Sequence, residues 1–249
     1  MKKIFELDIN DDFRKAIISQ FALMVGVFCM SIFTAVEEQN AFQITYLFEL
    51  LILSVGFNFY FESQKNRNYA YWTISIILLI YILFDILKYT FVEYNIFILY
   101  IAFLSLIFLI INCYIMSSPL FFPRVQWWEY DFHYRGDIKS LLKLNQDSLN
   151  SRITDIRRQS ACIEAFEFIP LDSIVTLELQ FDDKYFSLPI KIKTSKVVIP
   201  GRPFRYGAKF IFNEDNSKKS YIELLKIWNS NKTAKIRNKF LESTKNESK

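Results

Sequence analysis

Four long segments with almost no charged residues dominate the first half of this 249-residue chain. The first, residues 16–35, holds twenty consecutive uncharged residues. A helix of roughly that length crosses the ~30 Å hydrocarbon layer of a bilayer. The others cover residues 42–61, 69–92 and 95–116, and Pro119 follows the last. The sequence therefore predicts a four-helix transmembrane domain over residues 16–116, after a short N-terminal segment, residues 1–15.

The distribution of basic residues predicts how these segments are oriented. The first and third connections contain no lysine or arginine, whereas the N-terminal segment, the second connection and the half after the fourth segment all contain them. Basic residues favour the cytoplasmic side of a membrane. Both termini are therefore expected in the cytoplasm. The basic residues that precede the first segment or lie in the second connection are Lys2, Lys3, Arg14, Lys15, Lys65 and Arg67.

Three charged residues interrupt the apolar segments. Glu49, Asp85 and Lys88 all fall toward the predicted outer side. They could line a path for an ion or proton, which would suit a small channel or transporter with a cytoplasmic regulatory domain. Alternatively, Lys88 forms a structural ion pair with Glu49 or Asp85 near the outer interface. The apolar segments show no internal repeat that would favour a transporter.

The second half of the chain differs in charge and contains few chemically reactive residues. Residues 1–116 carry 7 basic and 10 acidic residues, whereas residues 117–249 carry 23 and 16. Cys29, Cys113 and Cys162 are widely spaced, His133 is the only histidine, and no metal-ligand spacing occurs. Five glycines provide no phosphate-binding loop. We therefore expect buried reduced thiols, no metal, no cofactor and no enzymatic activity.

An aromatic and basic linker, residues 117–136, connects the two halves. Its tryptophans and tyrosines follow the fourth apolar segment directly, and such rings favour the headgroup region of a bilayer. They could equally pack the second half against its linker. Both readings are consistent with these residues: Trp127, Trp128, Tyr130 and Tyr134.

Six short segments of alternating or β-branched residues follow, separated by turn signals such as "FDDKY" and "PGRP". No helical pattern separates them, so a parallel α/β fold is not expected. The sequence predicts a six-stranded barrel with a C-terminal helix over residues 137–230. The six predicted strands are residues 138–144, 151–156, 161–169, 173–181, 185–199 and 204–212.

The closing helix is predicted from a capping box at Ser220 and Glu223. One apolar face, made of Tyr221, Leu224, Leu225 and Trp228, is expected to pack on the barrel. The remaining tail, residues 231–249, is polar and basic. We expect it to be frayed or to lie on anionic lipid.

The sequence from the linker to the closing helix resembles the PilZ family. A basic linker leads into a first strand, a second strand ends in "DIRRQS", and a later strand reads "YGAKF". The family has Asp-x-Ser-x-x-Gly after its second strand and Gly-x-x-Phe near its last. Asp155 matches the aspartate, Arg157 and Ser160 replace the serine and glycine, and Gly207 with Phe210 match the last motif. The resemblance implies a six-stranded barrel that in many bacterial proteins binds cyclic di-GMP.

The family also has two arginines four residues apart before the first strand. Asp131 stands four residues before Arg135, whereas Lys139 stands four residues after it. Arginine suits such a ligand because its planar group binds phosphate and stacks on a base. Arg157 and Arg158 could supply the missing cations, or form a solvated turn or a patch for lipid or a protein partner. The candidate ligand residues are Arg124, Arg135, Lys139, Asp155, Arg157, Arg158 and Ser160.

Two functions remain open at this point. The chain could be a membrane-anchored cyclic di-GMP receptor of the bacterial inner membrane, in which the ligand orders the linker. It could instead be a degenerate PilZ-like interaction module that binds an unknown protein and no cyclic di-GMP. The expected partners are the lipid bilayer, a protein and, for the receptor, cyclic di-GMP, with no nucleic acid polymer.

Overall fold

The computed structural model describes residues 9–122, 137–144, 147–181, 184–196, 203–212 and 215–247. The chain divides into two compact units, Met1–Met116 and Ser117–Lys249. The predicted linker residues Arg124 and Arg135, with the tryptophans and tyrosines between them, lie outside the described residues.

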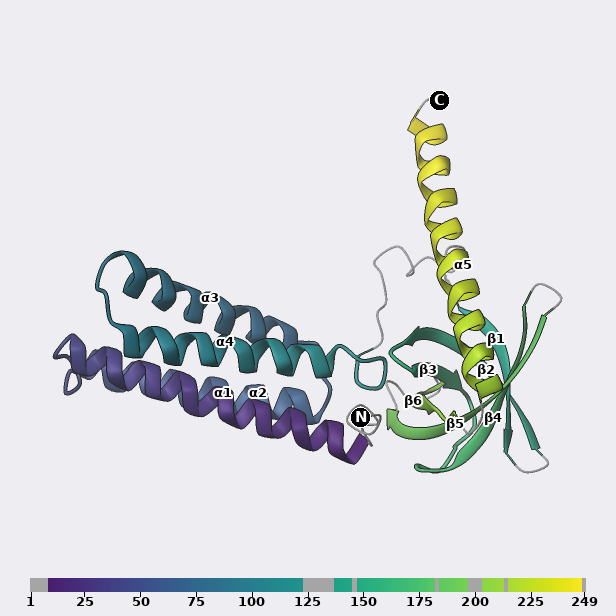
Figure 1. Cartoon of the computed structure of the whole chain (residues 1–249), viewed down its shortest axis with the longest axis horizontal. Helices are drawn as coiled ribbons and strands as arrows, with labels where there is room; N and C mark the ends of the chain where they lie inside the picture. The colour runs from purple at the N-terminus through teal and green to yellow at the C-terminus, as the bar shows by residue number, and fades with distance from the viewer. Residues whose placement is uncertain are drawn as a thin grey trace. The chain divides into compact units, whose positions relative to one another are not determined.

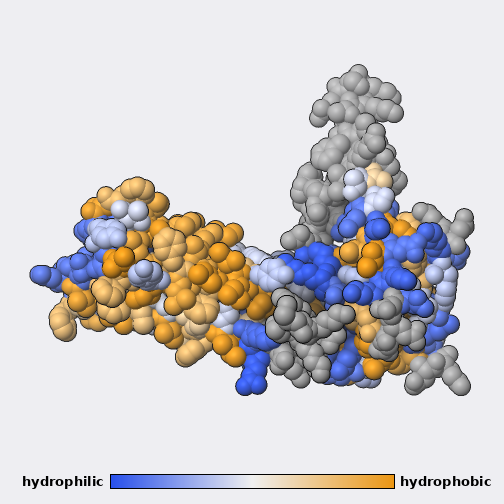
Figure 2. Space-filling model, viewed as in Figure 1, coloured by the Kyte–Doolittle hydropathy of each residue, from blue (hydrophilic) through white to orange (hydrophobic). Residues whose placement is uncertain are grey.

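The first unit consists of four helices, α1 (Ile9–Glu37), α2 (Ile44–Lys65), α3 (Ala70–Phe91) and α4 (Ile96–Met116) (Figure 1). All four are long and apolar enough to cross a membrane. Hydrophobic side chains cover most of the visible surface of these helices (Figure 2). The four helices predicted from hydropathy are therefore confirmed, although α1 begins seven residues earlier than predicted, at Ile9 instead of Ala16.

Polar side chains join the four helices internally. The Tyr71 hydroxyl donates to Asn112 Oδ1 over 2.6 Å, and Asn112 Nδ2 donates to the Ala16 carbonyl over 3.1 Å, which links α3, α4 and α1. The hydroxyls of Tyr60 and Ser75 lie 2.9 Å apart and join α2 to α3. Such bonds satisfy polar groups that lipid cannot satisfy.

The charged residues within the apolar helices are paired differently from the prediction. Glu49 accepts hydrogen bonds from Ser31 Oγ (3.1 Å) and Tyr81 OH (2.8 Å), which lie on two other helices. Lys88 forms its ion pairs with carboxylates at the ends of α1 and α3, because its flexible side chain reaches toward the helix termini. Its partners are Glu38 and Glu93, not Glu49 or Asp85.

The second unit is a closed barrel of six antiparallel strands, in the order β1-β2-β3-β6-β5-β4 (Figure 1). Side chains that alternate along each strand fill its interior with aliphatic and aromatic groups. The predicted barrel is therefore confirmed. The strands are β1 (Ile138–Leu144), β2 (Asp147–Arg157), β3 (Ser160–Ala165), β4 (Ile174–Phe181), β5 (Lys184–Lys196) and β6 (Phe204–Phe210).

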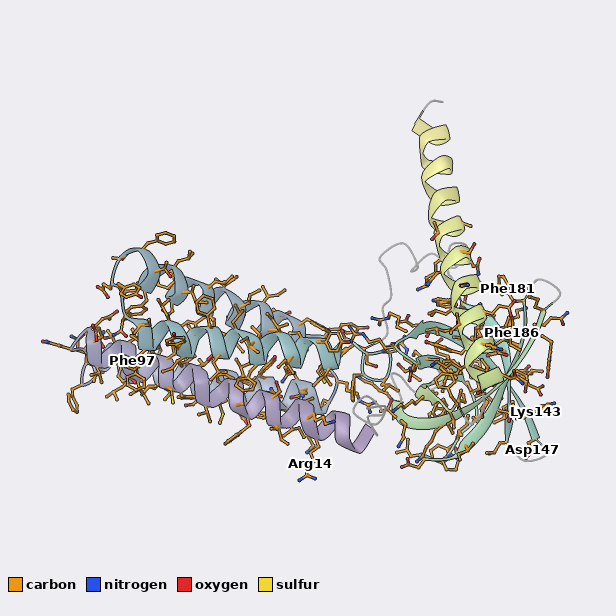
Figure 3. The ribbon with its side chains drawn as sticks, viewed as in Figure 1. Arg14, Phe97, Lys143, Asp147, Phe181 and Phe186 are labelled. Atoms are coloured by element: carbon orange, nitrogen blue, oxygen red, sulfur yellow. The ribbon has the colours of Figure 1, made fainter. Side chains whose placement is uncertain are left out.

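Two strand boundaries differ from the prediction by four residues. β2 begins earlier, at Asp147, and forms a tight hairpin with β1; the labelled Lys143 and Asp147 belong to the two strands of this hairpin (Figure 3). β3 ends at Ala165, and Phe166 and Phe168 are 72% and 68% exposed. The chain bends at residues 166–167, so the alternation that continues to residue 169 no longer belongs to the sheet.

The helix α5 (Asp215–Glu247) closes the second unit. Tyr221, Leu224 and Trp228 are buried on the barrel, as predicted, and the rings of Tyr221 and Phe210 lie 4.8 Å apart. Ser220 lies inside the helix, so the predicted capping box is wrong. The helix continues through the polar tail, which contains several residues of high helix propensity, lysine above all.

Candidate functional site

The candidate site is built on the hairpin between β2 and β3. Its two-residue turn consists of Arg158 and Gln159, with φ angles of 49° and 59°. Two left-handed residues match the twist of a tight hairpin but are unusual without glycine. The turn is held by two hydrogen bonds, because the Gln159 amide donates to Tyr221 OH (3.0 Å) and its carbonyl accepts from the Phe210 amide (2.9 Å). The hairpin thereby fixes the end of β2.

Arg157 and Asp155 form an ion pair at this strand end. Arg157 Nε donates to both carboxylate oxygens, at 3.2 and 3.0 Å, and Nη2 donates to Oδ2 at 2.7 Å. The Asp155 side chain is 2% exposed and that of Arg157 18%. Alternate residues of a strand share a face, as expected for this pair. The forked geometry is one that arginine, and not lysine, can provide.

The same guanidinium binds the chain that follows α4. Arg157 Nη1 donates to the Ser117 carbonyl at 2.9 Å, and Nη2 donates to the Phe122 carbonyl at 3.3 Å. Between these residues the chain turns, because the amides of Phe121 and Phe122 both donate to the Ser118 carbonyl at 3.0 Å. We call residues 117–122 the docked segment. Arg157 holds both of its ends.

The docked segment covers one row of barrel residues. In the register of the sheet, Asp155 pairs with Cys162, Cys162 with Gly207, and Gly207 with Thr194. Paired residues project from the same side of a sheet. Thr194 Oγ1 donates to the Leu120 carbonyl at 2.8 Å. Each end of this row therefore contributes a contact to the segment. At one end Asp155 orients Arg157, which binds the segment, and at the other Thr194 binds it directly.

Gly207 permits the closest approach of the segment to the barrel. A Cβ atom at this position would lie 2.8 Å from both Cα and the carbonyl oxygen of Leu120, and 2.4 Å from Thr194 Oγ1. No side chain fits there without displacing backbone atoms. An isolated glycine within a strand is a known mark of such an approach. Leu120, Phe121 and Phe122 are accordingly 6%, 6% and 4% exposed.

Two small polar residues complete the contact. Ser160 Oγ donates to the Arg157 carbonyl at 2.8 Å and lies 3.3 Å from Ser118 Oγ of the docked segment. Cys162, in the middle of the row, is 2% exposed. Burial raises the pKa of the Cys162 thiol to about 11. This thiol is therefore protonated and shielded at neutral pH.

The structure brings together some of the predicted ligand residues and separates others. Asp155, Arg157 and Ser160 meet under the docked segment, and Arg158 is exposed in the turn. Lys139 lies on another part of the barrel, opposite Arg152 on β2. Arg124 and Arg135 lie outside the described residues. The sequence did not reveal that Arg157 binds Ser117 and Phe122, or that Thr194 binds Leu120, because these partners are far apart in sequence.

The chemistry of the site is that of a docking contact. A guanidinium, a carboxylate, two hydroxyls and a glycine recognise backbone carbonyls and apolar side chains. Among the residues that the structure describes, no group of His, Cys, Asp or Glu side chains could hold a metal ion. The chain matches no known protein-family model and no curated protein sequence.

Proposed function

We propose that this chain is a membrane-anchored signalling module of the PilZ type, in which the docked segment is the connection that transmits the signal. The observation that carries this proposal is that Arg157 donates hydrogen bonds to the carbonyls of Ser117 and Phe122. Ser117 directly follows α4, which ends at Met116. Docking or release of residues 117–122 would thus change how the barrel is tethered to the last apolar helix.

The contacts favour an interaction module over a cyclic di-GMP receptor. Arg157, the best-placed candidate cation, already binds a buried carboxylate and two carbonyls. A phosphate could reach its guanidinium only by replacing those carbonyls. In this form of the proposal, the barrel binds a protein partner and the four helices localise the complex.

The receptor is a second candidate because Asp155, Gly207 and Phe210 match residues of the family motifs in sequence. Cyclic di-GMP would then compete with the docked segment for Arg157. Ligand binding would release residues 117–122, which is the opposite of ordering the linker. Under either candidate, we propose that the protein lies in the bacterial inner membrane with both termini in the cytoplasm.

Calorimetric titration of cyclic di-GMP into the full chain, held in lipid nanodiscs, tests the two candidates. The interaction module predicts no heat from a folded protein. The receptor predicts binding that weakens in Arg157→Gln and strengthens in Gly207→Ala, because the latter displaces the competing segment without removing a cation. Binding that is unaffected by either substitution would contradict a ligand site at Arg157.

A further inference from the structure

A groove opens at one end of the helix bundle, between the start of α1 and the end of α2. It encloses about 630 Å³. Ile17 on α1 and Phe61 on α2 give it apolar walls. Its polar lining residues come from the C-terminal part of α2 and its cap: Asn58, Glu62, Gln64, Lys65 and Asn66. Basic side chains gather at this end: Lys15 precedes Ile17, and Arg14 points away from the bundle (Figure 3). If the helices cross a bilayer, this groove lies at the depth of the lipid headgroups.

Gln64 supplies an unsatisfied acceptor to the groove. Gln64 is 1% exposed, and its Oε1 has no hydrogen-bond partner among the residues that the structure describes. Its Nε2 makes only a weak contact, 3.7 Å from Met116 Sδ. A buried carbonyl oxygen without a donor is costly, most of all next to hydrocarbon. A donor that enters the groove would remove this cost.

Two opposite charges lie beside this acceptor. Glu62 and Lys65 are three residues apart on α2, so they lie on neighbouring positions of one helix face. Both line the groove and both are exposed. In the part of the chain that the structure describes, neither forms an ion pair. The groove thus offers one anionic group, one cationic group and one buried acceptor.

We infer that this groove binds a phospholipid whose headgroup carries a primary ammonium, as phosphatidylethanolamine does. The ammonium donates to the Glu62 carboxylate and to Gln64 Oε1, and Lys65 binds the phosphate. An acyl chain lies along Ile17 and Phe61. Phosphatidylcholine lacks the N–H donors that Gln64 and Glu62 require, and phosphatidylglycerol lacks the cation.

Native mass spectrometry of the full chain tests this inference. The protein is released from micelles that contain phosphatidylethanolamine, phosphatidylcholine and phosphatidylglycerol in equal amounts. We expect phosphatidylethanolamine adducts to exceed each of the others by about tenfold, the preference that one charge-assisted hydrogen bond provides. Water-soluble glycerophosphoethanolamine should not compete, because it lacks the acyl chains.

Substitutions locate the site. Glu62→Gln and Gln64→Leu should each abolish the preference, and Lys65→Gln should weaken binding of all three lipids. Gln43→Leu, at the opposite end of α2, and Lys15→Gln, at the same end of the bundle but outside the groove, are the matched controls. Equal adducts of the three lipids in the unsubstituted chain would overturn the inference. A preference for phosphatidylethanolamine that persists in both Glu62→Gln and Gln64→Leu would also overturn it. Glu62→Gln is a conservative change at an exposed residue, so it should leave the fold intact.

Discussion

Arg157 Nη2 lies 2.7 Å from Asp155 Oδ2, and this ion pair also connects the barrel to residues 117–122. The carboxylate orients the guanidinium, and the guanidinium binds the carbonyls of Ser117 and Phe122. A strand end of the barrel is thereby fastened to the chain that follows the fourth apolar helix.

Loss of the Arg157 side chain should destabilise the barrel. Arg157→Ala leaves the Asp155 carboxylate buried without its cation, which costs about 3 kcal/mol. Hydrogen exchange of the barrel amides in the full chain, resolved by mass spectrometry, measures the change. Arg152→Ala is the matched control on the same strand. Arg152 forms an ion pair with Asp137 at the surface, with Nη1 3.3 Å from Oδ2. Loss of this pair should reduce the stability by less than about 1 kcal/mol. Equal effects of the two substitutions would show that the Arg157 pair has no special role.

Gly207→Ala should displace the docked segment and leave the barrel folded. The added methyl group would meet backbone atoms of Leu120 at 2.8 Å, so the segment has to move. We expect faster hydrogen exchange at residues 120–122 with little change in β3 and β6. Gly56→Ala is the control, because a Cβ atom there meets nothing within 4 Å. Unchanged protection of residues 120–122 in Gly207→Ala would contradict the close approach.

A larger residue at Gly26 should separate α1 from α4. A Cβ atom at Gly26 would lie 2.4 Å from Ser105 Oγ, which marks a close helix contact through small residues. Gly26→Leu should destabilise the bundle by about 1–3 kcal/mol, the usual cost of overpacking. Thermal unfolding in detergent, compared with Gly56→Leu, measures this. The smaller change Gly26→Ala should also lower the stability, and adding Ser105→Gly should restore much of that stability because it removes the hydroxyl that the new Cβ atom meets. If it does not, the contact between residues 26 and 105 does not limit the packing.

The buried thiol of Cys162 should make the barrel less stable at alkaline pH. Burial raises its pKa in the folded protein from 9.0 to about 11. The folded state therefore holds its proton at a pH where the unfolded chain releases it. This contribution is constant below pH ~9, and stability falls by up to about 1.4 kcal/mol per pH unit between pH 9 and 11. The difference in stability between the unsubstituted chain and Cys162→Ala should narrow over this range. A difference that is independent of pH would show that the thiol is not shielded.

The sequence predicted the two units because each has a strong periodic signal. Uninterrupted hydropathy defined the four helices, and alternation defined the six strands. The extent of α5 was missed because the apolar face that supports a helix prediction ends at Trp228. The tail is helical through Glu247 although its sequence contains few apolar residues. Local composition, and not packing, is the signal that could have extended it.

The candidate site was only half predictable. Asp155 and Arg157 stand two residues apart, so their common face follows from the period of a strand. Their true partners, the carbonyls of Ser117 and Phe122, lie 35 to 40 residues away in sequence. Backbone carbonyls carry no residue-specific signal. Gly207 was the one available hint, because an isolated glycine in a strand often marks a close backbone approach.

The most direct test of the central claim is the reactivity of Cys162 in the full chain, embedded in nanodiscs and labelled with a thiol reagent at neutral pH. Peptide mass spectrometry separates Cys162 from the other two cysteines. If Arg157 holds the docked segment over this row, labelling should be slow in the unsubstituted chain and in Arg152→Gln. It should be at least about tenfold faster in Arg157→Gln, which removes charge-assisted hydrogen bonds to the segment. The same slow labelling in Arg157→Gln, with the barrel still folded, would contradict the claim.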